Sequence, residues 1–105
     1  MSATNEIFSD RYFIVCQIEA PGDNVEELVQ AFKPMIQFFE SGQEPGTLMF
    51  RVVHFENKFV VFEQYENLAA QLLHRQSEPY KTLGAFLRSI KAKMDLKYYE
   101  GVFQP

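Results

Sequence analysis

Two apolar segments separated by only two residues constrain the fold of this chain more than any other feature. Residues 46–55 and 58–65 are almost continuously apolar or aromatic, and only Glu56 and Asn57 lie between them. A two-residue connection between such segments predicts a β-hairpin. Apolar side chains on both faces of the hairpin require a cover on each face. The helices of the chain can provide one cover, and the sheet of a second subunit is the expected other.

The tight turn also sets the strand register. It places Phe55 opposite Lys58 and Phe50 opposite Glu63. Because side chains alternate between the faces of a strand, two sets of residues follow. One face is expected to carry Leu48, Phe50, Val52, Val61, Glu63 and Tyr65, and the other Met49, Arg51, Val53, Val60, Phe62 and Gln64. The pattern leaves open which of these faces meets the helices.

The residues before the hairpin predict a strand and a helix. Residues 11–20 are rich in β-branched and aromatic side chains and stop at a Pro-Gly pair, which is typical of a strand followed by a turn. Apolar residues then recur at helical spacing between 25 and 39. Pro34 lies inside this pattern and predicts a kink or a break. Gly42 is expected to end the helix in a left-handed conformation.

The residues after the hairpin predict two helices and a final strand. Asn67 is a capping residue for a short helix at 68–76, and Ser77 is the cap of a longer helix that follows. The buried stripe of the longer helix is expected to be Tyr80, Leu83, Leu87, Ile90 and Met94. Residues 96–103 close the chain as a strand. The order β-α-β-β-α-α-β predicts an α+β, ferredoxin-like sandwich with a four-stranded antiparallel sheet.

The chain length and composition predict one globular domain. With 105 residues, of which 47% are hydrophobic and 23% charged, the chain can form a single core. We expect this domain at 11–105 and a flexible polar arm at 1–10. Eleven Phe and five Tyr without a Trp are many aromatic residues for so small an interior. Some of this aromatic surface is therefore expected to line a pocket or a subunit interface.

The net charge argues against two kinds of partner, and the cysteine count bears on the location of the protein. A net charge of −4 and a pI near 5.1 argue against nucleic acid or an anionic membrane as a partner. No apolar segment approaches the roughly 18 residues of a membrane span. The single cysteine, Cys16, cannot form an internal disulfide, which favours a reducing, cytoplasmic location. Inside a strand pattern, Cys16 is expected to be a small core residue rather than a nucleophile.

His74 and Glu63 are the candidate chemical groups. The sequence has no glycine-rich phosphate loop, CxxC or HExxH, and two histidines twenty residues apart do not make a metal site, so neither cofactor nor metal is expected. An imidazole near the end of a short helix suits a general base, although His74 could instead support the loop at Ser77. A carboxylate within an apolar strand must meet a donor. Glu63 is therefore expected either to fix the helix on the sheet or to pair with His74.

Three motifs resemble the antibiotic biosynthesis monooxygenase type of domain. They are EPG at 44–46, FEQYEN at 62–67, and His74 followed by SEPYK at 77–81. The resemblance implies a small α+β fold that pairs through its sheets into a dimeric barrel, with the Tyr65 face toward the helices. It also implies that His74 lines a ligand cavity and that Tyr65, where many members have tryptophan, forms a wall and a donor. The apolar lining would then be Leu48, Phe50, Phe32, Ile36, Phe39 and Tyr80.

Two functions follow from the resemblance. The first is a cofactor-independent monooxygenase acting on a phenolic, quinol-like or polyketide-type aromatic molecule, with His74, Tyr65 and Glu63 as the catalytic group. The second is a non-catalytic dimeric barrel that binds a small apolar aromatic molecule. Haem degradation, known in this family, is disfavoured because Val15, His74 and Gly84 stand where the haem-degrading branch has asparagine, tryptophan and the iron-binding histidine.

Overall fold

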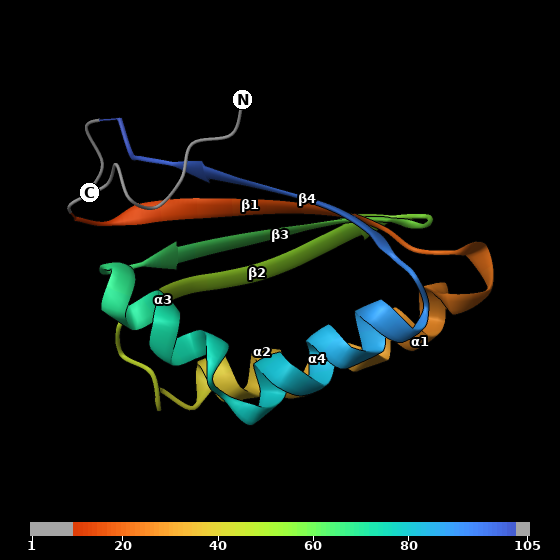
Figure 1. Cartoon of the computed structure of the whole chain (residues 1–105), viewed down its shortest axis with the longest axis horizontal. Coiled ribbons are helices and arrows are strands. Elements are labelled where there is room, and N and C mark those ends of the chain that lie inside the picture. The colour runs from red at the N-terminus through yellow and green to blue at the C-terminus, as the bar shows by residue number, and fades with distance from the viewer. Residues whose placement is uncertain (1–9, 103–105) are drawn as a thin grey trace.

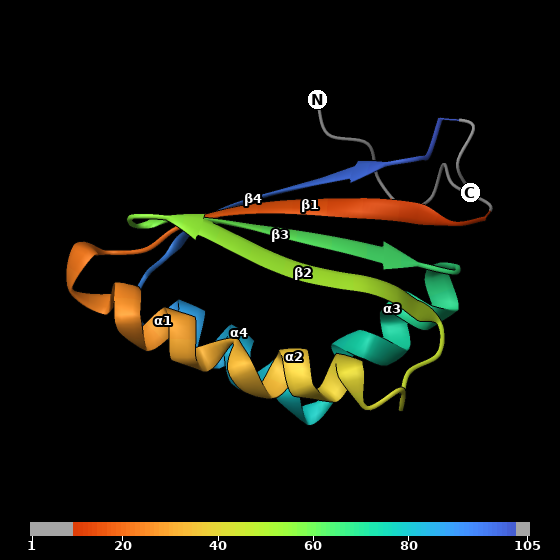
Figure 2. The ribbon, with the colours of Figure 1, turned by 180° about the vertical axis from the view of Figure 1, so that it is seen from behind.

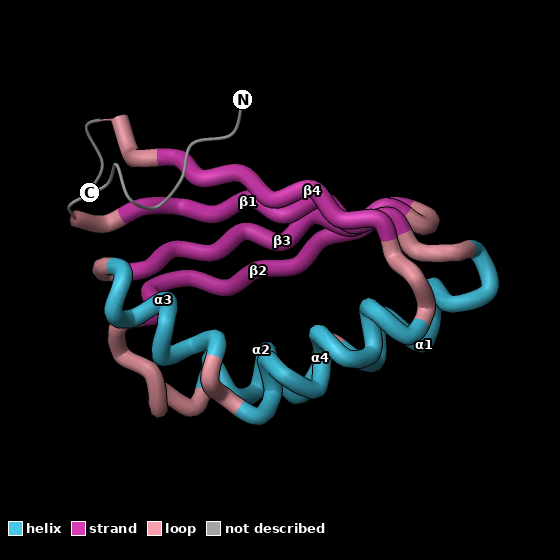
Figure 3. The backbone as a smooth tube through the Cα atoms, viewed as in Figure 1, coloured by secondary structure: helices cyan, strands magenta, loops and turns pink. Residues whose placement is uncertain are grey.

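A four-stranded antiparallel sheet with all helices on one face forms the domain (Figures 1 and 2). The computed structural model describes residues 10–102, so the predicted arm at 1–10 lies outside the described residues except for Asp10. The strands are β1 Tyr12–Glu19, β2 Thr47–Phe55, β3 Lys58–Tyr65 and β4 Lys93–Tyr99. The helices are a 3-10 turn η2 Gly22–Asn24, α1 Val25–Ala31, α2 Lys33–Glu40, α3 Leu68–Arg75 and α4 Glu78–Ser89. The spatial order β2-β3-β1-β4 confirms the ferredoxin-like fold (Figure 3).

The register predicted for the hairpin is correct over most of its length. Phe55 pairs with Lys58 and Phe50 with Glu63. Near the start of β2 the register shifts between Thr47 and Met49, so that Thr47 rather than Leu48 lies opposite Tyr65. This irregularity inserts one extra residue into the strand, and Leu48 leaves the regular alternation of faces.

The face of the hairpin that carries Tyr65 meets the helices. Val61 and Tyr65 are 3% and 1% exposed, whereas Phe62 on the opposite face is 38% exposed. The central strand β1 extends the buried face, with Cys16 opposite both Val61 and Leu96. The core is therefore a single layer between sheet and helices.

The first helical segment breaks where Pro34 predicts. α1 and α2 meet at Phe32, and Pro34 occupies the first turn of α2, where its missing N–H is not needed. The break keeps Phe32 and Met35 buried at 2% and 1% exposure. Gly42 has φ of 76°, as expected for the left-handed residue that follows a helix.

The last helix is shorter, and the last strand begins earlier, than the sequence pattern predicts. α4 ends at Ser89 because Lys91 takes a left-handed φ of 56°, with Ala92 N–H donating to Leu87 O and Lys91 N–H to Arg88 O. This is the Schellman arrangement, which usually has glycine at the position of Lys91. Met94 consequently belongs to β4 and is 53% exposed instead of extending the helix stripe. The strand covers 93–99 rather than 96–103, and Phe103 lies outside the described residues.

Candidate functional site

An apolar cavity of about 190 Å³ lies between the sheet and helices α3 and α4. A dry cavity of about 150 Å³ is enough to admit a benzene ring, so this space suits a small aromatic molecule. Six of the predicted site residues line it: His74, Tyr65, Glu63, Phe50, Phe32 and Tyr80. The remaining lining residues are mostly apolar side chains from β1, β4 and α4.

Three of the residues predicted to line the cavity lie elsewhere. Leu48, Ile36 and Phe39 lie together along a second groove between α2 and β2. Leu48 lies away from the cavity because the shift in register removes it from the position opposite Tyr65. The cavity is therefore bounded on this side by Phe32 and Phe50 alone among the predicted residues.

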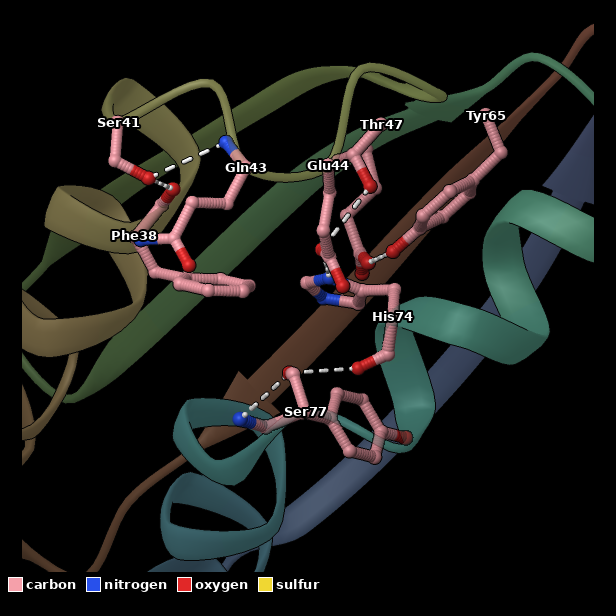
Figure 4. A network of polar contacts seen from close by, with 10 residues as sticks. Phe38, Ser41, Gln43, Glu44, Thr47, Tyr65, His74 and Ser77 are labelled. Carbon is pink, nitrogen blue, oxygen red and sulfur yellow. Dashed lines mark hydrogen bonds and ion pairs between the residues drawn. The ribbon is translucent and has the colours of Figure 1, made fainter.

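Two helix caps, one before and one after His74, fix the position of this residue beside the cavity. The Asn67 side chain accepts from the backbone N–H of Ala70 at 2.9 Å and begins α3, and Ser77 accepts from Tyr80 N–H at 3.3 Å and begins α4. Ser77 also donates to the backbone oxygen of His74 at 2.7 Å, so the loop contact uses the main chain and leaves the imidazole for other partners (Figure 4).

The His74 ring is enclosed by aromatic side chains. His74 is 1% exposed. Its ring centroid lies 5.4 Å from that of Tyr80, 5.5 Å from that of Tyr65 and 6.1 Å from that of Phe50. The imidazole is therefore both dry and in contact with three walls of the cavity.

The carboxylate that holds His74 is Glu44, not Glu63. The Nδ1 atom of His74 lies 2.7 Å from Oε1 of Glu44, and the two side chains are 2% and 9% exposed (Figure 4). An ionised carboxylate only accepts, so Nδ1–H is the donor and the neutral ring has its lone pair on Nε2. Nε2 has no hydrogen-bond partner among the described residues. The sequence pattern missed this role of Glu44, because Glu44 lies thirty residues from His74 and only the tertiary fold brings them together.

Glu63 meets a different donor, the hydroxyl of Tyr65 (Figure 4). Burial raises the pKa of the Glu63 carboxyl, while the Tyr65 hydrogen bond, His74 and Arg75 oppose that increase. Burial and the adjacent Glu63 raise the pKa of Tyr65, which keeps its hydroxyl protonated as a donor. Burial likewise raises the pKa of the Cys16 thiol to about 12, so this cavity residue is not a thiolate nucleophile.

A second polar cluster includes two residues that line the cavity, Gln71 and Arg75. The Tyr12 hydroxyl donates to Oε1 of Gln71, and Nε2 of Gln71 donates to the Tyr98 hydroxyl at 3.3 Å. Arg75 donates to the same Tyr98 hydroxyl at 2.9 Å. Gln71 and Arg75 lie on α3, one helical turn apart, while Tyr12 and Tyr98 lie on adjacent strands. The sequence analysis did not identify Gln71 or Arg75 as site residues, although their spacing from His74 places all three on one side of a helix.

The described part of the chain offers no other obvious centre. No three His, Cys, Asp or Glu side chains come together there as a potential metal site. Between residues 10 and 102, no helix combines the length and apolar character needed to cross a bilayer. His54 lies at the hairpin turn, with its ring stacked on Phe59 at 4.7 Å and its Nδ1 3.0 Å from the Glu56 carbonyl.

The sheet order and the internal cavity define a ferredoxin-like α+β domain with a buried imidazole between its layers. The sequence model of the family described as antibiotic biosynthesis monooxygenase matches residues 11–85. The chain belongs to this family. No curated protein matches the sequence.

Solved structures share the fold at low sequence identity. A Caulobacter crescentus protein provisionally named an antibiotic biosynthesis monooxygenase superposes with a TM-score of 0.82 at 20% identity, over 93% of this chain and 95% of that chain. Rv0793 from Mycobacterium tuberculosis gives 0.76 at 17% identity, over 88% and 95%. A variant of SnoaB, a cofactor-independent oxygenase from Streptomyces nogalater, gives 0.72 at 14% identity, over 89% and 94%. At these identities the likeness concerns the fold alone.

Proposed function

We propose that this domain is a cofactor-independent monooxygenase for a small phenolic or quinol-like aromatic molecule, with Nε2 of His74 as the base. One observation carries the proposal: a buried imidazole on the wall of an apolar cavity has Nδ1 bound to a carboxylate, while its Nε2 meets no hydrogen-bond partner within residues 10–102. A carboxylate behind an imidazole fixes its tautomer and stabilises the imidazolium that forms when it takes a proton.

The proposed reaction needs only a base and a dry cavity. Nε2 of His74 removes the phenolic proton, and the electron-rich anion transfers electrons to dioxygen. For an anthrone-type substrate the ring CH₂ becomes a carbonyl. One oxygen atom of O₂ enters the product, and the other leaves as water with the two hydrogens of that carbon. The buried aromatic walls contributed by Phe50 and Tyr65 shield the intermediate from water.

Tyr65 and Glu63 are proposed to orient the substrate oxygen. The Tyr65 hydroxyl is held by Glu63, and both side chains line the cavity close to His74. The raised pKa of Glu63 favours its protonated form more than in an exposed carboxyl. A protonated Glu63 can itself donate a hydrogen bond, which would stabilise negative charge on the substrate oxygen.

We also infer that two copies pair through the faces of their sheets that are opposite the helices. Val53 and Phe62 on this face are 49% and 38% exposed in the single chain, and Val15, Met49 and Val60 beside them are half-buried. An apolar sheet face of this kind is costly in water. Pairing of sheets into a dimeric barrel, which family membership favours, would cover it.

Oxygen consumption by the purified protein tests the proposed function. The substrates are 1,4-dihydroxynaphthalene, menadiol and anthrone, and mass spectrometry after reaction under ¹⁸O₂ measures incorporation of one labelled atom into the anthrone product. His74→Gln is expected to abolish turnover. His54→Gln is the matched control because His54 is the second histidine and does not line the cavity.

Two results would contradict this assignment. If His74→Gln reacts as fast as the parent, His74 is not the base. If none of the three substrates reacts but they bind stoichiometrically, the domain is the non-catalytic aromatic-binding protein that is the second function open to this family.

A further inference from the structure

Two arginines are among the residues that line the mostly apolar cavity. Both Arg75 from α3 and Arg88 from α4 line the cavity. Three partly exposed residues also line the cavity, namely Met94 and Leu96 of β4, which are 53% and 36% exposed, and Tyr80, which is 38% exposed. β4 is an edge strand of the sheet and lies next to β1 (Figures 1 and 2). We call the group of Arg75, Arg88, Met94 and Leu96 the mouth.

The Arg88 side chain lies along helix α4 beside Gly84. Gly84 precedes Arg88 by one helical turn, and a Cβ atom added at Gly84 would lie 3.4 Å from Nη1 of Arg88. The guanidinium therefore rests over Gly84, which also lines the cavity. Side chains in a helix point toward its N-terminus, so Arg88 extends in the direction of Tyr80 and the α3–α4 junction.

Arg75 reaches the mouth from the other side of that junction. One of its Nη atoms donates to the Tyr98 hydroxyl at 2.9 Å, which fixes the guanidinium between α3 and β4. Arg75 also acts on the interior, because its charge lowers the pKa values of Glu63 and Tyr80 against the effect of burial. The guanidinium is therefore positioned by a hydroxyl group rather than by a carboxylate.

Neither arginine forms a direct ion pair with a carboxylate in the described residues. The ion pairs there join His74 to Glu44, Lys81 to Glu78 and Lys97 to Asp95. The one carboxyl group among the described residues that line the cavity, Glu63, is on strand β3 and accepts a hydrogen bond from Tyr65. A guanidinium group can bind a planar carboxylate in a bidentate manner, and both arginines line the same cavity.

We infer that the mouth binds a carboxylate on the substrate, so the ligand is an aromatic hydroxy acid with its ring in the cavity and its acid group between Arg75 and Arg88. This inference rests on the proposed function for the phenolic ring. The recognition of the acid group depends only on the mouth. Neutral phenols lack the group that the arginines bind, and they are the poorer ligands.

Anaerobic calorimetry tests the inference without any turnover. The probes are 1-hydroxy-2-naphthoate, its methyl ester and 1-naphthol. The acid is expected to bind at least tenfold more tightly than the ester or 1-naphthol, and its affinity should fall as the salt concentration rises. Arg88→Gln is expected to weaken binding of the acid about fivefold or more and to change 1-naphthol binding less than twofold.

Two further variants complete the test. Arg75→Gln should act in the same direction as Arg88→Gln, although it also removes the contact with Tyr98. Lys81→Gln is the matched control, because it removes one positive charge from the same helix α4 at a residue outside the cavity and should leave all three affinities unchanged. Circular dichroism of each variant confirms that it is folded.

The inference is overturned if the acid, the ester and 1-naphthol bind equally, if Arg88→Gln weakens all three to the same extent, or if none binds up to its solubility limit. These results are distinguishable from failure of the proposed function. A protein that selects the acid but consumes no oxygen with any phenol retains the anion site and loses the monooxygenase assignment. A protein that oxidises 1,4-dihydroxynaphthalene without selecting the acid retains the monooxygenase assignment and loses the anion site.

Discussion

Replacing Glu44 by glutamine tests the central feature of the site, the carboxylate behind His74. The amide oxygen of glutamine can still accept from Nδ1–H, so the substitution keeps the hydrogen bond and the tautomer. It removes only the negative charge. We expect the imidazolium formed on proton transfer to be less stable, and kcat to fall while KM changes little.

The size of the effect follows from the geometry. The Nδ1–Oε1 distance is 2.7 Å, and the side chains are only 2% and 9% exposed, so water screens the pair weakly. A hydrogen bond to a charged group contributes about 1.5–3 kcal/mol against about 0.5–1.5 for a neutral one. The difference of roughly 1–1.5 kcal/mol corresponds to about a tenfold loss in kcat. Glu44→Ala removes the acceptor as well, and its loss should be greater, on the order of a hundredfold.

Two measurements check this prediction. Steady-state oxygen consumption gives kcat and KM for the parent and both Glu44 variants. Long-range ¹H–¹⁵N spectra report which ring nitrogen of His74 carries the proton, and the two histidines of the chain are assigned with His54→Gln. In the parent, Nδ1 should be protonated and Nε2 bare. Glu78→Gln is the control, since its side chain is 87% exposed and lies 4.0 Å from Lys81.

The reasoning fails if Glu44→Gln retains the full kcat of the parent, or if the spectra show a bare Nδ1 and a protonated Nε2 in the neutral ring. The second result refutes the geometry even if no substrate is turned over.

Three further changes test other parts of the structure. The folded-state pKa of Glu63 is raised above its ordinary value of 4.5, so the folded protein holds this proton more tightly than the unfolded chain, and stability falls as the pH rises from the unfolded toward the folded pKa. The unfolding free energy of Glu63→Gln should therefore rise relative to that of the parent between these two pKa values, and the difference should stay constant at higher pH. Urea unfolding at a fixed protein concentration from pH 4 to 8 measures both free energies. A difference that does not change with pH would contradict the prediction. Gly46→Ala places a Cβ 2.6 Å from that of Ala70, which must push α3 away from β2, so we expect a loss of about 1–3 kcal/mol in unfolding free energy and weaker ligand binding. Phe62→Lys puts a charge on the outer sheet face and should convert a dimer into a monomer in sedimentation velocity, whereas Lys81→Gln, at an exposed residue of helix α4 on the other side of the sheet, should not; an unchanged sedimentation coefficient for Phe62→Lys would exclude this interface.

The hairpin, the caps and the helix break could all be predicted from the sequence, because each depends on neighbouring residues. The two-residue connection at Glu56 and Asn57 fixes the pairing of Phe50 with Glu63. Asn67 and Ser77 accept hydrogen bonds from the first turns of their helices. The same local logic failed at Lys91, where a lysine occupies the left-handed position that glycine usually takes, so α4 ends before the apolar pattern does.

The sequence by itself determined that this chain forms an antiparallel sheet with one helix-covered face, and it identified His74, Glu63 and Tyr65 as the polar groups to examine. Only the tertiary structure decided their partners. Glu44 holds His74, and Tyr65 rather than His74 meets Glu63. The physical reason is that periodicity specifies which face of an element a side chain lies on, whereas a hydrogen bond between buried groups depends on the separation of atoms from distant segments, which is set when the helices pack on the sheet.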